Sequence, residues 1–124
     1  MNSTVREWLD KAQADFAMAG REMRAGRRRS NDGIYFHAQQ CIEKLMKAVL
    51  TDRGDVPPRT HDLVVLGNRV WTLEPSWSWD AAQLRFLTQG AVLFRYPGES
   101  ATPQDARQAM AYARKLRESL LALL

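Results

Sequence analysis

The stretch FHAQQCIEKLMKAVL, residues 36–50, decides the fold because its apolar residues recur at helical spacing. On a wheel turned by about 100° per residue, these apolar side chains fall on one side of a helix. The opposite side carries Gln39, Gln40, Glu43, Lys44 and Lys47, with His37 at its edge beside the apolar side. The stretch therefore predicts an amphipathic helix whose polar residues form one surface stripe, either a solvated face or a functional one.

The same periodicity extends along the rest of the chain, and no segment alternates as a strand would. A first helix is predicted over about residues 4–25, with Ser3 or Thr4 as its cap. The second begins after the SND sequence at residues 30–32 and stops near Gly54. A short, tilted third helix starts at Thr60, a fourth covers about residues 80–95, and a fifth starts at Thr102 with Pro103 in its first turn. These segments predict an all-α fold, an antiparallel up-and-down bundle of four to five helices in one domain, residues 1–124.

Composition fits a folded chain of 124 residues, of which 45% are hydrophobic and 26% charged. No apolar run is long enough for a membrane span, and the charged N-terminal sequence MNSTVREWLDKAQADF lacks the apolar stretch of a signal peptide. The single cysteine, Cys41, has no internal disulfide partner and fits a reducing compartment. We therefore expect a cytoplasmic protein without membrane contact.

The net charge of +4 has its main local source in GREMRAGRRRS, residues 20–30, where five arginines face one glutamate. Such a cluster attracts phosphates, because each arginine that neutralises a phosphate releases a counterion. It can equally be a solvated loop between two helices. No aromatic residues are interleaved with these arginines, which argues against a stacking platform for single-stranded nucleic acid.

Two histidines are the main candidates for acid-base chemistry. His37 can act as a general acid or base near neutral pH, or can be a hydrogen-bonded structural residue at the core boundary. His61, in the sequence RTHDL, can belong to a helix cap. The chain has no phosphate-binding loop, dinucleotide fingerprint or nucleophile elbow, and its histidines and cysteine lack metal-ligand spacing. We therefore expect no cofactor and no metal.

An ordered set of short motifs nevertheless resembles the prokaryotic HEPN domain. The set comprises Phe36, Ala38, Gln39-Gln40, Glu43-Lys44, Lys47-Ala48, His61-Asp62-Leu63 and Arg95-Tyr96-Pro97, with Trp8 and Asp15 in the opening helix. The resemblance covers nearly the whole chain. It implies a bundle of four to five helices that is commonly a homodimer, often encoded beside a small nucleotidyltransferase with which it forms a toxin-antitoxin or related pair.

Many proteins of this kind are metal-independent endoribonucleases, whose motif is an arginine followed four to six residues later by a histidine. Others have been proposed to bind nucleotides or to act as helical adaptors. This chain departs from the catalytic pattern, because the residues after Arg95 are YPGESATPQDAR. Arg107 and Tyr112 have the spacing of a tyrosine variant of the motif, but they fall in an ordinary amphipathic helix.

Three hypotheses follow. The first is a HEPN partner of a nucleotidyltransferase that acts by binding; its dimer or partner surface would use Trp71, Trp77, Trp79 and Tyr96, unless these residues pack the end of the bundle. The second is a metal-independent endoribonuclease toxin, with His37, His61 and Arg95 as the candidate catalytic residues if folding brings them together. The third is an adaptor that binds a nucleotide or RNA in a groove lined by His37, Gln40, Lys44, Arg95 and Tyr96. For the last two we predict that Arg95, in the last turn of the fourth helix, faces the polar stripe of residues 36–50.

Overall fold

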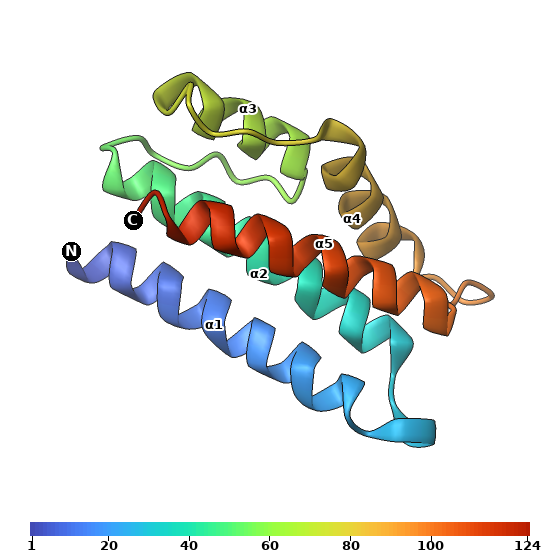
Figure 1. Cartoon of the computed structure of the whole chain (residues 1–124). Helices are drawn as coiled ribbons and strands as arrows, with labels where there is room; N and C mark the ends of the chain where they lie inside the picture. Colours follow the sequence, from blue (N-terminus) through green and yellow to red (C-terminus); the bar gives the residue numbers. More distant parts are fainter.

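The computed structural model describes all residues 1–124 and contains five α-helices and no strand (Figure 1). The helices are α1 (Ser3–Met23), α2 (Asn31–Asp52), α3 (Leu63–Leu73), α4 (Ala81–Leu93) and α5 (Pro103–Leu121), with a short 3-10 turn, η1 (Gly26–Arg28), between α1 and α2. The predicted all-helical bundle is confirmed.

Helix α2 is the centre of the bundle, because it packs against each of the other four helices. Helix α1 lies antiparallel along it (Figure 1). Helix α5 runs in the same direction as α2. At one end of the pair Asp32 accepts a hydrogen bond from the Ala101 amide, and at the other end Arg53 donates to the Leu123 carbonyl. The shorter helices α3 and α4 lie across one side of this frame, and both contact α2.

Two of the four predicted helix caps are confirmed, those of α2 at Ser30 and of α5 at Thr102. Thr102 and Asp105 form a reciprocal capping box at the start of α5. Two predicted caps are wrong. Asn2, rather than Ser3 or Thr4, accepts the Val5 amide at the start of α1. Asp62, rather than Thr60, caps α3, because the Thr60 hydroxyl instead accepts the amide of Asp62 itself.

Two helices also end earlier than predicted. Helix α1 ends at Met23 rather than residue 25, and α4 ends at Leu93 rather than residue 95. Arg95 and Tyr96 therefore belong to the turn after α4, where their amides still bond to the Val92 and Leu93 carbonyls. That turn, rather than a helical register, sets the direction of the two side chains.

Two glycines allow close packing between helices, Gly90 between α4 and α2 and Gly67 between α3 and α4. A Cβ atom at Gly90 would overlap the ring of Tyr35, whose hydroxyl donates to the Phe86 carbonyl. A Cβ atom at Gly67 would lie 2.7 Å from a methyl group of Leu84. The glycine inside α3 is thus explained by its contact with α4. None of the five helices combines the length and apolar character that crossing a bilayer requires.

Candidate functional site

The polar stripe of α2 is largely buried, which corrects the prediction of a surface stripe. Gln39, Glu43 and Lys47 are only 1%, 3% and 8% exposed. The helical wheel placed them opposite the apolar residues, but it could not show what packs over them. The segment before α3 covers Gln39 and Glu43 through His61, and the Trp8 ring of α1 lies 5.5 Å from the Lys47 ammonium.

Glu43 is the centre of one polar network, which we call the Glu43 cluster: Glu43, Gln39, Gln40, Lys47 and His61. Its Oε1 accepts from the two glutamine side chains at 3.2 and 3.3 Å and lies 2.9 Å from the Nδ1 of His61. Its Oε2 accepts from the Lys47 ammonium at 3.1 Å. Gln39 also donates to the His61 carbonyl at 3.1 Å. The cluster therefore fixes the segment before α3 onto the middle of α2.

A second network, the Asp15 cluster, joins α1 to α2 and consists of Asp15, His37 and Lys44. Asp15 is buried; its Oδ1 lies 2.7 Å from the Nδ1 of His37, and its Oδ2 accepts from the Lys44 ammonium at 2.5 Å. No buried side-chain nitrogen or oxygen in the chain lacks a hydrogen-bond partner. Asp15 thus stabilises the contact between α1 and α2 through one histidine and one lysine, whereas Glu43 reaches the segment before α3 through His61 and pairs with Lys47 on its own helix.

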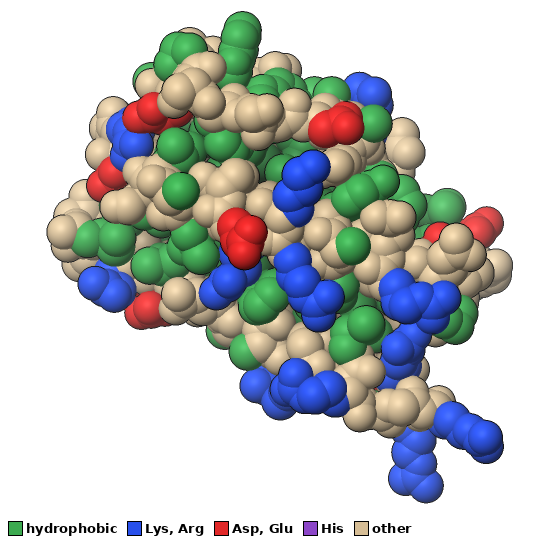
Figure 2. Space-filling model, in the orientation of Figure 1, with side chains coloured by type: hydrophobic (Ala, Val, Ile, Leu, Met, Phe, Trp, Pro, Cys, Tyr) green, Lys and Arg blue, Asp and Glu red, His purple; other side chains and the backbone are tan.

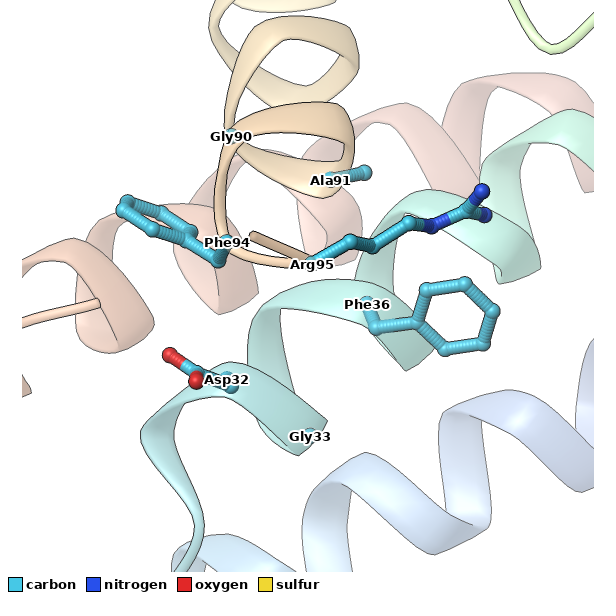
Figure 3. Close-up of a pocket in the computed structure, with 7 residues that line it drawn as sticks. All are labelled: Asp32, Gly33, Phe36, Gly90, Ala91, Phe94 and Arg95. Carbon is cyan, nitrogen blue, oxygen red and sulfur yellow. The ribbon is translucent and has the colours of Figure 1, made fainter. Parts of the chain in front are cut away.

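Arg95 lies at a separate open groove of about 270 Å³ (Figure 3). The groove is lined by Asp32, Gly33, Phe36, Gly90, Ala91, Phe94 and Arg95. The guanidinium carbon of Arg95 is 5.4 Å from the centre of the Phe36 ring, and its side chain extends over that ring, away from Asp32. This cation–π contact is the only side-chain interaction that holds Arg95, and it makes no ion pair.

The structure brings some of the predicted site residues together. The ring of Phe36 contacts both Arg95 and His37: its centre is 5.4 Å from the Arg95 guanidinium carbon and 5.4 Å from the imidazole centre. Arg95 therefore faces α2 at Phe36. His37 lines a different hollow, with Arg21 and Glu22, and His61 contacts Glu43. Gln40 and Lys44 are bonded within the Glu43 and Asp15 clusters, while Tyr96 is 62% exposed.

Sequence reasoning gave Asp15 no chemical role, although a signal was present. Asp15 follows Ala12 by three residues and precedes Ala19 by four, so it occupies a position of the apolar stripe of α1. A carboxylate at such a position must find a buried partner. Phe36, likewise, was noted only as part of a motif, yet it is the residue that connects Arg95 to His37.

The tryptophans of the proposed partner surface divide into two kinds. Trp77 is buried, stacks on Trp79 with ring centres 5.8 Å apart, and donates its indole N–H to Ser119. These two residues pack the end of the bundle. Trp71 is half exposed on α3 and remains available. Tyr112 is partly buried and packs edge-on against Phe86 at the margin of the core.

Burial also governs Cys41, on the side of α2 that faces α1. Burial raises the pKa of its thiol to about 12; the Asp15 carboxylate also raises it, while Arg117 and Lys44 act in the opposite direction. A thiol with so high a pKa is a poor nucleophile at neutral pH. No three His, Cys, Asp or Glu side chains are grouped as a metal ion would require. The chemistry that the arrangement offers is therefore that of imidazoles oriented by carboxylates, and of the exposed arginines.

Comparison with known proteins agrees with this architecture. A crystal structure of TT1696 from Thermus thermophilus superposes with a TM-score of 0.80 over 99% of this chain and 100% of that one, at 19% sequence identity. No curated protein sequence matches the chain. The sequence pattern of the HEPN domain matches residues 5–123, which span all five helices and both carboxylate clusters. The chain therefore belongs to the HEPN domain family.

Proposed function

We propose that this HEPN domain works as a binding module, one half of a toxin-antitoxin-like pair with a small nucleotidyltransferase. The proposal rests on one observation: the polar residues of α2 are bonded to other residues of the bundle. The buried carboxylates of Asp15 and Glu43 contact both histidines of the chain and two lysines of α2. These side chains connect elements of the bundle, and the family's usual arginine-histidine spacing is absent from the sequence.

The partner surface that we propose is the outer end of α4. Val92, Leu93 and Tyr96 are 50%, 46% and 62% exposed, and Arg95 lies beside them over Phe36. Aliphatic, aromatic and arginine side chains in one place are the composition that protein interfaces favour at their centre. The surface is continuous with the Asp15 cluster at one point, because the Phe36 ring contacts both Arg95 and His37.

Co-expression with the product of the adjacent gene tests this proposal. The two proteins should elute as one complex at micromolar concentration, and light scattering should give the number of copies of each, including any HEPN homodimer. Replacement Val92→Lys should weaken the complex at least about tenfold, or about 1.4 kcal/mol. Lysine is tolerated near the C-terminal end of a helix, so α4 should remain folded.

Val56→Lys provides the matched control. Val56 is an equally large aliphatic residue, 81% exposed, in the loop after α2. The control should bind as the unmodified protein does. Elution of the unmodified HEPN protein alone, in the presence of the co-expressed partner, would overturn the proposal.

One observation favours a second function, metal-independent cleavage of RNA. His61 is exposed, and its Nδ1 contacts the buried Glu43 carboxylate, which leaves Nε2 directed away from that contact. A carboxylate that orients an imidazole in this way is the arrangement used for general bases. Purified protein with a chelator should then cut RNA, and His61→Ala should abolish cutting while His61→Gln fails to restore it. Intact RNA after incubation with varied substrates, tRNA among them, would exclude this function.

A further inference from the structure

A broad basic face covers the end of α1, the η1 turn and one flank of α5. We propose that it binds the phosphate backbone of double-stranded nucleic acid. The inference does not rest on the nucleotidyltransferase pairing proposed above. The face, which we call the arginine face, has two rows: Arg24, Arg27 and Arg28 at the end of α1 and in η1, and Arg107, Arg114 and Arg117 along α5.

The fold brings the two rows to the same end of the bundle. The Asp32–Ala101 hydrogen bond places the start of α5 beside the start of α2, which follows directly after η1. Across the bundle, the guanidinium carbon of Arg117 lies 4.4 Å from the ring centre of Phe16 on α1. Helical spacing puts Arg107 and Arg114 on the same flank of α5 as Arg117. Figure 2 shows Lys and Arg side chains over α1, η1 and along α5.

The charges of this face are not neutralised within the chain. All six arginines lack an ion pair with any carboxylate, whereas Lys44, Lys47 and Arg69 each have one and Arg53 has two. The nearby carboxylates serve the backbone instead: Glu22 accepts the Ser30 amide, and Asp105 accepts the Thr102 amide. The stretch 21–32 carries five arginines and two carboxylates, so it supplies most of the net charge of +4. The face therefore attracts anions strongly.

The residue types point to several phosphates rather than one. The basic residues are arginines, whose planar guanidinium binds phosphate oxygens in pairs. Arg107 and Arg117 are about 15 Å apart along α5, at a rise of about 1.5 Å per residue. A single nucleotide cannot span that distance together with the row on α1 and η1. An extended backbone of phosphodiesters can.

The arginine face has no exposed large apolar side chains, which argues against a membrane or a protein as its partner. Exposed large hydrophobic residues occur at Met1, in the loop after α2, on α3 and on α4, but none lies in residues 21–30 or in α5. A membrane-binding face needs such residues beside its basic ones, and a protein interface needs them at its centre. Single strands are held by stacking on aromatic rings, and the one aromatic ring at the centre of this face, Phe16, is covered by Arg117. A duplex, whose bases are already stacked, needs only phosphate contacts.

Fluorescence anisotropy with labelled duplexes of about 20 base pairs tests the proposal, in parallel arms with RNA and DNA and with the separated strands of each. The intact protein should bind one or both duplexes more tightly than the single strands, and binding should weaken by at least about a hundredfold between about 50 and 200 mM salt. Replacements Arg27→Gln with Arg28→Gln, and separately Arg107→Gln with Arg114→Gln, should each lower the salt slope by roughly 2. The two rows should thus contribute similarly.

The matched control is Arg59→Gln with Arg85→Gln, which removes the same charge from exposed positions off the arginine face. It should leave the salt slope unchanged. An equal decrease of the salt slope in all three double variants would show that net charge alone attracts the duplex, and would overturn the proposal. Equal affinity for duplexes and single strands would also overturn it. Binding to vesicles containing anionic lipid, without binding to either duplex, would also overturn it and assign the face to a membrane.

Discussion

The Asp15 and Glu43 clusters use the same chemistry on two flanks of α2, yet they are built differently. Each has a buried carboxylate with one histidine and one lysine. In the Glu43 cluster the carboxylate and most of its partners belong to α2, each partner within about one turn of Glu43, and only His61 comes from elsewhere. In the Asp15 cluster the carboxylate comes from α1 and both partners from α2. One cluster is therefore largely local, and the other exists only when two helices pack.

This difference shows which cluster depends on tertiary structure. The local partners of Glu43 can remain near it in a partly folded helix, since Gln39 and Lys47 lie one turn away. Asp15 has no such neighbours, and its charge is compensated only by α2. However, Glu43 receives four side-chain contacts, and its lysine is more deeply buried than that of Asp15. The number and burial of the contacts, rather than their origin, should set the energetic rank.

Replacement Glu43→Gln should have the largest effect, a loss of about 3 kcal/mol in the free energy of unfolding. It removes the charge that compensates the buried Lys47 ammonium and presents an amide N–H₂ to two glutamine donors. Urea denaturation measures the loss. Glu118→Gln, at an exposed position of α5, is the control and should change stability by less than about 0.5 kcal/mol. An equal, small effect for both variants would contradict the proposed rank.

Replacement Asp15→Asn should cost somewhat less, about 2 kcal/mol. The side chains of Lys44 and His37 are 22% and 28% exposed, so water partly replaces the lost carboxylate. The control is Asp10→Asn, an exposed position on the same helix. The loss should appear in urea midpoints and as faster amide hydrogen exchange in α1, because this cluster joins α1 to α2. Faster exchange in α3 instead would reverse the assignment of the two clusters.

The comparison also explains how much of the molecule could be predicted from sequence. The spacing of apolar residues and the capping residues were sufficient to predict the five helices, because both signals are local. The capping box at Thr102 is one example. The burial of Gln39 and Glu43 could not be read from a wheel, since the covering segment comes from beyond the end of α2. The wheel gives the angle of a side chain, whereas its exposure depends on whichever element packs at that angle.

The proposed site shows the same limit. Arg95 was predicted to face the polar stripe of α2 from the last turn of the fourth helix, but it lies after α4 and contacts the Phe36 ring instead. That contact depends on α4 ending at Leu93, two residues earlier than its apolar spacing indicated. Trp77 and Trp79 could be assigned either to a surface or to the bundle end from sequence. Their stack and the hydrogen bond to Ser119 require α5 beside them, which only the tertiary fold supplies.

The stability at alkaline pH tests the α1 side of α2, where Cys41 lies beside the Asp15 cluster. Its pKa is raised to about 12 from 9.0, mainly by burial, so the folded state keeps a proton that the unfolded chain releases above pH 9. The stabilising contribution is present below pH 9 and is lost as pH rises towards 12. Between pH 9 and 10 the free energy of unfolding of the unmodified protein should fall by about 1 kcal/mol more than that of the Cys41→Ala variant. Parallel loss in both proteins would show that the thiol titrates normally.

The smallest expected effect is the difference between the two histidines. His37→Ala should cost about 1 kcal/mol and His61→Ala about 0.5 kcal/mol, because the His61 side chain is 69% exposed and water readily replaces it at Glu43. Double-mutant cycles with Asp15→Asn and Glu43→Gln isolate each pair from the effects of truncation. The His37–Asp15 coupling should exceed the His61–Glu43 coupling. The opposite order would mean that His61, though exposed, is the histidine that holds its segment on α2, and the Glu43 cluster would then depend on tertiary packing as much as the Asp15 cluster does.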